Sequence, residues 1–129
     1  MVTRRTAKNK GSQFEYDCQY SLKPLYPDIY RTVERGFQMQ YDLRSDKARL
    51  AFECKRLKGF TWNQIKGYLD KLHSKIPDSE TLAYLLFKGN NQPCLVAYYD
   101  RGFMIVREFE QEFSLRFEKH PSTRSKQCL

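Results

Sequence analysis

The sequence predicts an α/β domain in which a central mixed β-sheet is flanked by helices. Two observations support this class. Segments with the apolar spacing of a helix alternate with segments typical of strands, in the order α-β-β-β-α-β-β-β. The chain has 129 residues, 40% of them hydrophobic, which suffices for one packed core and is too short for two domains of ordinary size.

The first half of the chain is expected to form a helix, a strand and a β-hairpin. Ser12 and Glu15 have the spacing of a capping box. Two prolines end the apolar pattern of this first helix, whose members recur at helical steps: Phe14, Cys18, Leu22 and Leu25. Residues 29–35 are rich in β-branched and aromatic side chains, which favours a strand. Two stretches separated by a polar turn then predict the hairpin: strand 37–43, turn 44–47 and strand 48–54.

The second half is expected to form a helix followed by three strands. Thr61 is a candidate N-cap for a helix over residues 61–76, which Pro77 closes. The apolar residues of this helix have helical spacing: Trp62, Ile65, Leu69, Leu72 and Ile76. The strands follow as a buried apolar run and a hairpin around an Asp-Arg-Gly turn: 82–87, 94–99 and 103–108. Residues 109–117 are expected to contain a short helix.

Positive charge is unevenly distributed along the chain. Lys and Arg number 23 against 15 Asp and Glu, a formal net charge of +8. Residues 1–10 carry four basic groups and no acid, and are expected to be a flexible arm. Residues 11–118 would be the folded domain, and 119–129 a flexible polar tail. Residues 31–75 carry eleven basic and five acidic groups, which indicates a polyanion partner, although charge that merely keeps the protein soluble would look similar.

Several classes of protein are disfavoured by the composition. Apolar runs fall short of the roughly 20 residues that a membrane helix needs, and the basic N-terminus lacks the apolar segment of a secretory signal. The four cysteines form no CxxC pair, so reduced thiols are the simpler expectation. We therefore expect an intracellular protein with no membrane partner, in the cytoplasm of a prokaryote or encoded by a virus and acting in its host.

The predicted hairpin carries the strongest candidate site. Glu53 and Lys55 lie two apart on one strand and so face the same side, whereas Cys54 faces the other. The antiparallel partner strand can bring Asp42 close to Glu53. Two neighbouring carboxylates repel each other unless a cation lies between them, and their oxygens suit Mg²⁺. The alternative is a strand end with an ordinary surface ion pair.

These strings resemble a known enzyme family. Asp42 followed by residues 51–59 (AFECKRLKG) is similar to the core of the PD-(D/E)xK nucleases, and residues 9–22 (NKGSQFEYDCQYSL) resemble the first helix of archaeal-type Holliday-junction resolvases. The resemblance implies a restriction-endonuclease-like fold and a homodimer that cuts branched DNA with Mg²⁺, for which Mn²⁺ could substitute. The residues it implies for the active site are metal-binding Glu15, Asp42 and Glu53, the active-site Lys55, and the polar helix residue Gln64.

Several alternatives stay open at this point. Glu15 fits a metal ligand and also a capping-box residue. RecU-type resolvases share a similar opening and Glu-x-Lys strand, so the strings do not select a subfamily. A nuclease acting on single-stranded, flap or nicked duplex DNA fits as well, and so does a non-catalytic DNA-binding module with the nuclease fold.

Basic side chains near the motif and in the arm are the expected contacts to the DNA backbone. Those expected to bind DNA are Arg4, Arg5, Lys8, Lys10, Arg31, Arg35, Arg56 and Lys58. Trp62 could stack on a base, but its helical spacing favours packing in the core or in a dimer interface. His73 and His120 are isolated and are not expected to be catalytic.

Overall fold

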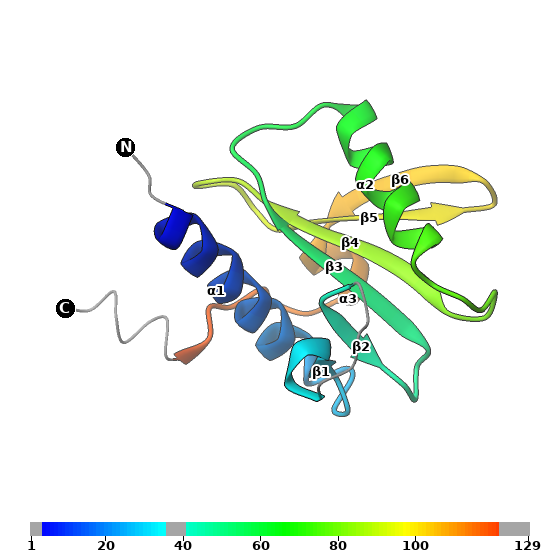
Figure 1. Ribbon diagram of the computed structural model, residues 1–129, viewed down its shortest axis with the longest axis horizontal. Helices are drawn as coiled ribbons and strands as arrows, with labels where there is room; N and C mark the ends of the chain where they lie inside the picture. Colours follow the sequence, from blue (N-terminus) through cyan, green and yellow to red (C-terminus); the bar gives the residue numbers. More distant parts are fainter. Residues whose placement is uncertain (1–3, 36–40, 122–129) are drawn as a thin grey trace.

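The computed structural model describes residues 4–35 and 41–121 of the chain, with side chains from residue 11 onward. Its helices and strands alternate in the expected order (Figure 1). They are α1 (Arg4–Leu22), β1 (Tyr30–Arg31), the 3-10 helix η1 (Thr32–Arg35), β2 (Leu43–Ser45), β3 (Leu50–Arg56), α2 (Trp62–Ser74), β4 (Leu82–Lys88), β5 (Leu95–Asp100), β6 (Phe103–Glu108) and α3 (Phe109–Phe113).

The described strands form one six-stranded mixed sheet in the order β1-β2-β3-β4-β5-β6. Only β3 and β4 pair in parallel, and α2 is the crossover between them that a parallel pair requires. The other neighbours in the sheet are antiparallel. The predicted class, an α/β domain with a mixed sheet flanked by helices, is therefore confirmed.

Two hydrophobic clusters cover the two faces of the sheet. Phe52 of β3 packs in the cluster that contains the α1 residues Phe14, Cys18 and Leu22. Its neighbour Ala51 packs in the other cluster, with the α2 residues Ile65, Leu69 and Leu72. Because side chains alternate along a strand, Glu53 and Lys55 share the α2 face with Ala51, while Cys54 packs against the α1 cluster.

The first helix is longer than the sequence pattern predicts. It begins at Arg4, inside the segment expected to be a flexible arm, so Ser12 and Glu15 lie within the helix and do not form an N-terminal capping box. The predicted apolar stripe is confirmed through Leu22, where the helix ends. Leu25 lies beyond it and is 46% exposed.

The first hairpin is shifted relative to the prediction. The strand expected at 29–35 is divided into β1 and η1. Residues 36–40 of the next predicted strand lie outside the described residues, and β2 starts only at Leu43. The turn occupies the residues after Ser45, whose hydroxyl donates to Asp28 at 2.8 Å and accepts from the Ala48 amide at 3.2 Å. Arg49 closes the turn with a φ of 55°.

The second half follows the prediction closely. Thr61 caps α2, and the reciprocal bonds with Gln64 form a capping box. The three predicted strands are present within one residue at each end, and the short helix expected within residues 109–117 occupies Phe109–Phe113. Arg101 and Gly102 both have positive φ, at 53° and 86°, as the tight turn between β5 and β6 requires.

The segment after α3 packs back along α1 (Figure 1). Ser21 is hydrogen-bonded to the backbone of Glu118 at 2.8 and 2.9 Å, and the His120 amide donates to Asp17 at 2.7 Å. The first residues of the expected tail, 119–121, thus lie against α1, and the remainder, 122–129, lies outside the described residues. None of the helices described here is both long and apolar enough to span a membrane.

Candidate functional site

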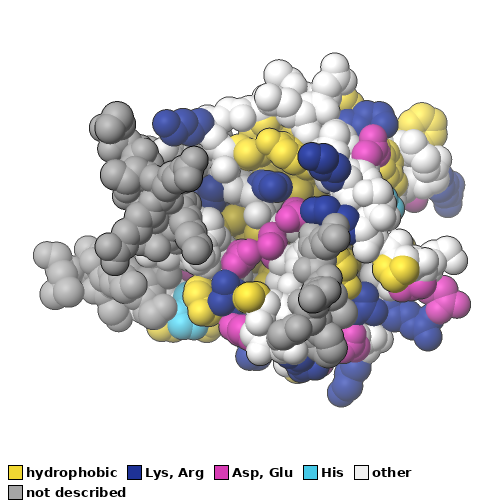
Figure 2. Space-filling model, in the orientation of Figure 1, with side chains coloured by type: hydrophobic (Ala, Val, Ile, Leu, Met, Phe, Trp, Pro, Cys, Tyr) yellow, Lys and Arg dark blue, Asp and Glu magenta, His cyan; other side chains and the backbone are white. Residues whose placement is uncertain are grey.

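The predicted carboxylates come from three elements, and Asp42 interacts with both of the others. Glu15 lies on α1, Asp42 directly precedes β2, and Glu53 lies on β3. The Asp42 carboxyl hydrogen-bonds Glu15 and feels the charge of Glu53. In Figure 2, Asp and Glu side chains gather near the middle of the visible face, between α1 and β3, and Lys and Arg side chains surround them.

Backbone contacts fix the position of Asp42. Its amide donates to the Phe52 carbonyl at 3.0 Å, and its Oδ2 accepts from the Cys54 amide at 2.8 Å. On the other side, the Thr32 hydroxyl donates to the Tyr41 carbonyl, and the Thr32 amide donates to the Asp42 carbonyl at 3.0 Å. Asp42 is therefore held beside the Glu53-Cys54-Lys55 segment, as the predicted hairpin required.

The pKa of Asp42 is raised to about 8, chiefly by burial and further by the interactions of its carboxyl with Glu15 and by the charge of Glu53. The Cys54 amide opposes it, because a donor to the carboxylate favours the charged form. At neutral pH the metal-free protein therefore keeps a proton on Asp42, next to Glu15. A proton shared between two acids marks a place where a cation would be electrostatically favoured.

Two basic side chains neutralise the outer acids. Arg31, which is buried at the end of β1, donates to Glu15 at 2.8 Å and lies 3.5 Å from Glu34. Lys75, at the C-cap of α2, approaches Glu53 at 3.4 Å. Lys75 is not among the residues that the sequence pattern indicates for the site. The available signal was its position three residues after Leu72, which places it beside the buried stripe of α2.

Lys55 lies on the same face as Glu53, as predicted, but its amine contacts an aromatic ring of α2 and does not pair with the Glu53 carboxylate. Its Nζ is 5.2 Å from the centre of the Tyr68 ring, close enough for a cation–π contact with α2. Within residues 11–35 and 41–121 no ion pair joins Lys55 to a carboxylate. Lys75 and not Lys55 pairs with Glu53, which leaves the Lys55 amine available to another anion.

Gln64 and Trp62 lie at the start of α2 and do not enter this cluster. The Gln64 Oε1 accepts from the Thr61 amide at 2.9 Å, so its side chain is occupied by the helix cap. Trp62 is 58% exposed, so it does not pack in the core, and the other half of that expectation, a place in a dimer interface, stays a prediction.

The basic residues expected to bind DNA are placed in different surroundings. Arg35 stacks over the Tyr30 ring at 3.7 Å, Arg56 donates to Asn90 at 2.7 Å, and Lys58 is exposed. Arg31 is instead buried in the acid cluster. The backbone of the N-terminal group belongs to α1, and its side chains lie outside the described residues: Arg4, Arg5, Lys8 and Lys10.

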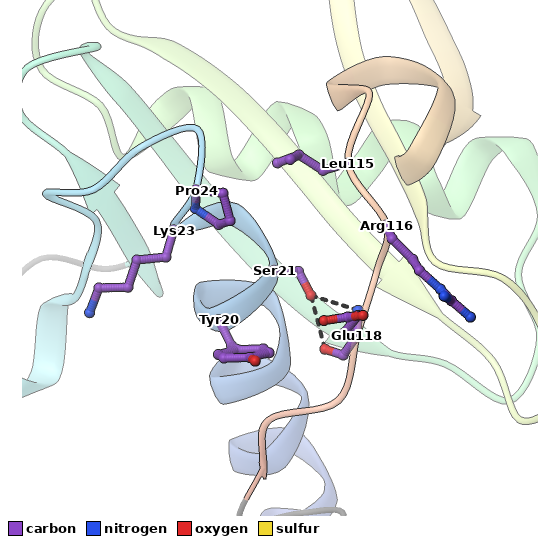
Figure 3. Close-up of a pocket in the computed structure, with 7 residues that line it drawn as sticks. All are labelled: Tyr20, Ser21, Lys23, Pro24, Leu115, Arg116 and Glu118. Atoms are coloured by element: carbon purple, nitrogen blue, oxygen red, sulfur yellow. Dashed lines mark hydrogen bonds between the residues drawn. The ribbon is translucent and has the colours of Figure 1, made fainter.

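A separate pocket of about 520 Å³ lies where the end of α1 meets the segment after α3 (Figure 3). Its two basic residues, Lys23 and Arg116, point away from each other, and its centre is occupied by the Ser21–Glu118 hydrogen bonds. None of the predicted site residues lines it, so it offers no convergent polar set for chemistry.

The acid cluster fits a hard divalent cation in its donor chemistry, since all of its ligand atoms would be carboxylate oxygens. In the described part of the chain, however, no three such side chains stand close enough to form a ready metal site. In the metal-free protein, the proton on Asp42 and the Arg31 guanidinium neutralise the carboxylates of Asp42 and Glu15. A metal ion would have to displace both.

Comparison of the chain with protein-family models, with curated proteins and with solved structures found no match in any of the three. The functional assignment therefore depends on the residues and geometry described above.

Proposed function

We propose that the protein is a metal-dependent endonuclease with a restriction-endonuclease-like fold that hydrolyses phosphodiester bonds in branched DNA. One observation carries the proposal: Asp42, adjacent to Glu15, is hydrogen-bonded to β3 between Glu53 and Lys55. This is the placement that the resemblance to the PD-(D/E)xK nucleases implies. The order of the helices and strands is compatible with it.

In this proposal Glu15, Asp42 and Glu53 hold Mg²⁺, for which Mn²⁺ could substitute. When bound, the metal polarises the scissile phosphate and lowers the pKa of a coordinated water. Lys55 orients the attacking water and offsets the negative charge that develops on the phosphate. Its amine suits that role because it contacts the Tyr68 ring and forms no ion pair with a carboxylate of the described residues. Gln64 would need to leave its helix cap to contribute.

The DNA backbone would be held by basic side chains at the surface, among them the exposed Arg35 and Lys58 and the half-buried Arg56. We further propose a homodimer, as the resemblance to junction resolvases implies, with one site for each of two symmetry-related strands. Light scattering in solution would give the mass of the assembly, and a monomer at micromolar concentration would contradict this part of the proposal.

The test is a cleavage assay on four-way junctions, flaps, nicked duplex and single strands. We expect cutting of the junction with Mg²⁺ and none with EDTA. Asp42→Asn, Glu53→Gln and Lys55→Met should each lower the rate at least about 100-fold, a typical loss for a catalytic group. The matched controls are Glu110→Gln and Lys71→Met, which change exposed residues outside the proposed set of metal and active-site residues. Full activity of both Glu53→Gln and Lys55→Met would refute the proposed site.

A second candidate, a non-catalytic DNA-binding module with the same fold, is favoured by one observation. Arg31 and Lys75 already neutralise Glu15 and Glu53, so the cluster is balanced without a metal. This candidate predicts junction binding that neither Mg²⁺ nor Asp42→Asn alters, together with no cutting of any substrate. Measuring binding and cutting on the same DNA panel separates the two candidates.

A further inference from the structure

Arg31 is the closest cation to Glu15 among the described ion pairs. Its guanidinium donates to the Glu15 Oε2 at 2.8 Å, and only 11% of the Arg31 side chain and 20% of the Glu15 side chain are exposed. The Glu15 carboxyl also hydrogen-bonds Asp42. Arg31 and Asp42 therefore both contact a carboxylate, that of Glu15, which the proposed function assigns to the metal.

The guanidinium is incompletely satisfied where it lies. Within the described residues, its Nε is buried and has no hydrogen-bond partner. A buried donor without a partner costs free energy, so this position of the side chain is less favourable than its ion pair alone suggests. The surface is also near, because Tyr16, over which the guanidinium stacks at 4.1 Å, and Glu34 are both more than a third exposed.

We propose that Arg31 is an internal counter-cation of the site: it holds Glu15 in the metal-free protein and must release it before a divalent cation binds. The inference rests on the proposed function and adds a regulatory contact to that same site. Arg31 is thus a positioning residue that competes with the metal. It is therefore more than one of the basic side chains that the sequence predicts to contact DNA.

Removing the charge of Arg31 has two effects on metal affinity, and both increase it. A variant without the charge frees an oxygen ligand of Glu15, and it also removes a positive charge that would repel the incoming cation at short range. Metal affinity should therefore increase when Arg31 is neutralised. The ordinary expectation for a basic residue whose role is to bind substrate is different, since its loss would leave the affinity for metal alone unchanged.

The test measures Mn²⁺ binding to the full chain without DNA, by the electron paramagnetic resonance signal of free Mn²⁺. We expect Arg31→Met to bind Mn²⁺ about tenfold tighter than the wild type. Arg31→Lys, which keeps the charge, should stay within about threefold of the wild type. In a Glu15→Gln background, Arg31→Met should lose most of its effect, because the ligand that Arg31 holds is gone.

Arg107→Met is the matched control, since Arg107 forms an ion pair with Glu112 near α3 and is remote from the acids. Circular dichroism establishes that each variant is folded. If Arg31→Met does not fold, Arg31→Gln keeps hydrogen-bond donors without the charge and should show the same tightening.

Two results would overturn the inference, and they are distinguishable. If the wild type binds one Mn²⁺ that Asp42→Asn abolishes, and Arg31→Met binds no tighter, Arg31 is not a competitor and the proposed metal site stands. If neither the wild type nor any Arg31 variant binds Mn²⁺, the metal site of the proposed function is itself refuted, and the counter-cation role with it.

Discussion

The protonated Asp42 gives the metal-free protein a distinctive dependence of stability on pH. Its pKa is about 8 in the folded chain against an ordinary value of 3.8. Between these values the folded state binds a proton that the unfolded state has lost. The free energy of unfolding contributed by this group therefore falls as the pH rises from about 4 to about 8, and it is constant beyond either limit.

The size of the effect follows from the same pKa difference. Each pKa unit corresponds to about 1.4 kcal/mol, so the change from 3.8 to about 8 sets a ceiling of about 6 kcal/mol. Asp42 is only partly buried, and water screens part of that cost. We therefore expect about 2–3 kcal/mol between pH 5 and pH 8.

Asp42→Asn isolates this contribution, because asparagine cannot ionise. Urea unfolding in EDTA at pH 5, 6, 7 and 8 gives the free energy of unfolding of both proteins, and the wild-type value minus the variant value should fall as the pH rises. Asp100→Asn, at an exposed position, is the control and should give a constant difference. A difference for Asp42→Asn that stays constant or grows with pH would refute the protonated acid pair.

Two further predictions concern the cations of the site. Lys75→Met should lower the free energy of unfolding by about 1–3 kcal/mol, because it leaves the mostly buried Glu53 carboxylate without its partner, whereas Lys71→Met on the exposed side of α2 should change it by less than about 0.5 kcal/mol. Urea unfolding at pH 7 measures both, and equal effects would contradict the ion pair. Mn²⁺ affinity should rise at least about tenfold from pH 6 to pH 8, because Asp42 must lose its proton to bind metal. Titrations at both pH values measure this, and an affinity independent of pH would argue against Asp42 as a ligand.

The parts of the fold that could be predicted are those with local signals at both ends. Thr61 and Gln64 mark the start of α2, and Pro77 marks its end. The apolar residues between them recur at helical spacing throughout. The turn at Arg101 and Gly102 fixes the last hairpin in the same way. Such signals depend on neighbours in sequence, so no knowledge of the tertiary structure was needed.

The start of α1 and the first hairpin lacked such signals. Residues 4–10 contain good helix formers and no breaker, so the helix continues toward the N-terminus past Ser12, and the apparent capping box is only a coincidence of spacing. Tyr41 fits an alternating pattern, yet β2 begins after it, because η1 and the Thr32 hydrogen bonds hold this segment in another conformation. Tertiary contacts decided both cases.

The arrangement of the candidate site could likewise be predicted only in part. The shared face of Glu53 and Lys55 followed from strand alternation, and the proximity of Asp42 followed from the hairpin. The ion pairs did not follow, because Arg31 and Glu15 are 16 residues apart and Lys75 and Glu53 are 22 apart on elements whose packing the sequence pattern does not give. Charge counts alone suggested DNA contact for Arg31 and gave Lys75 no role.

The contacts between α1 and the segment after α3 have a consequence for how the chain is made. Asp17 bonds to His120, 103 residues later, and Ser21 bonds to Glu118, 97 residues later. The helix that carries Glu15 is synthesised first, yet it cannot acquire these anchors until residues up to His120 have left the ribosome. During synthesis, α1 can therefore pack against β3 through Phe14, Cys18 and Leu22 before its hydrogen bonds to residues 118–120 form.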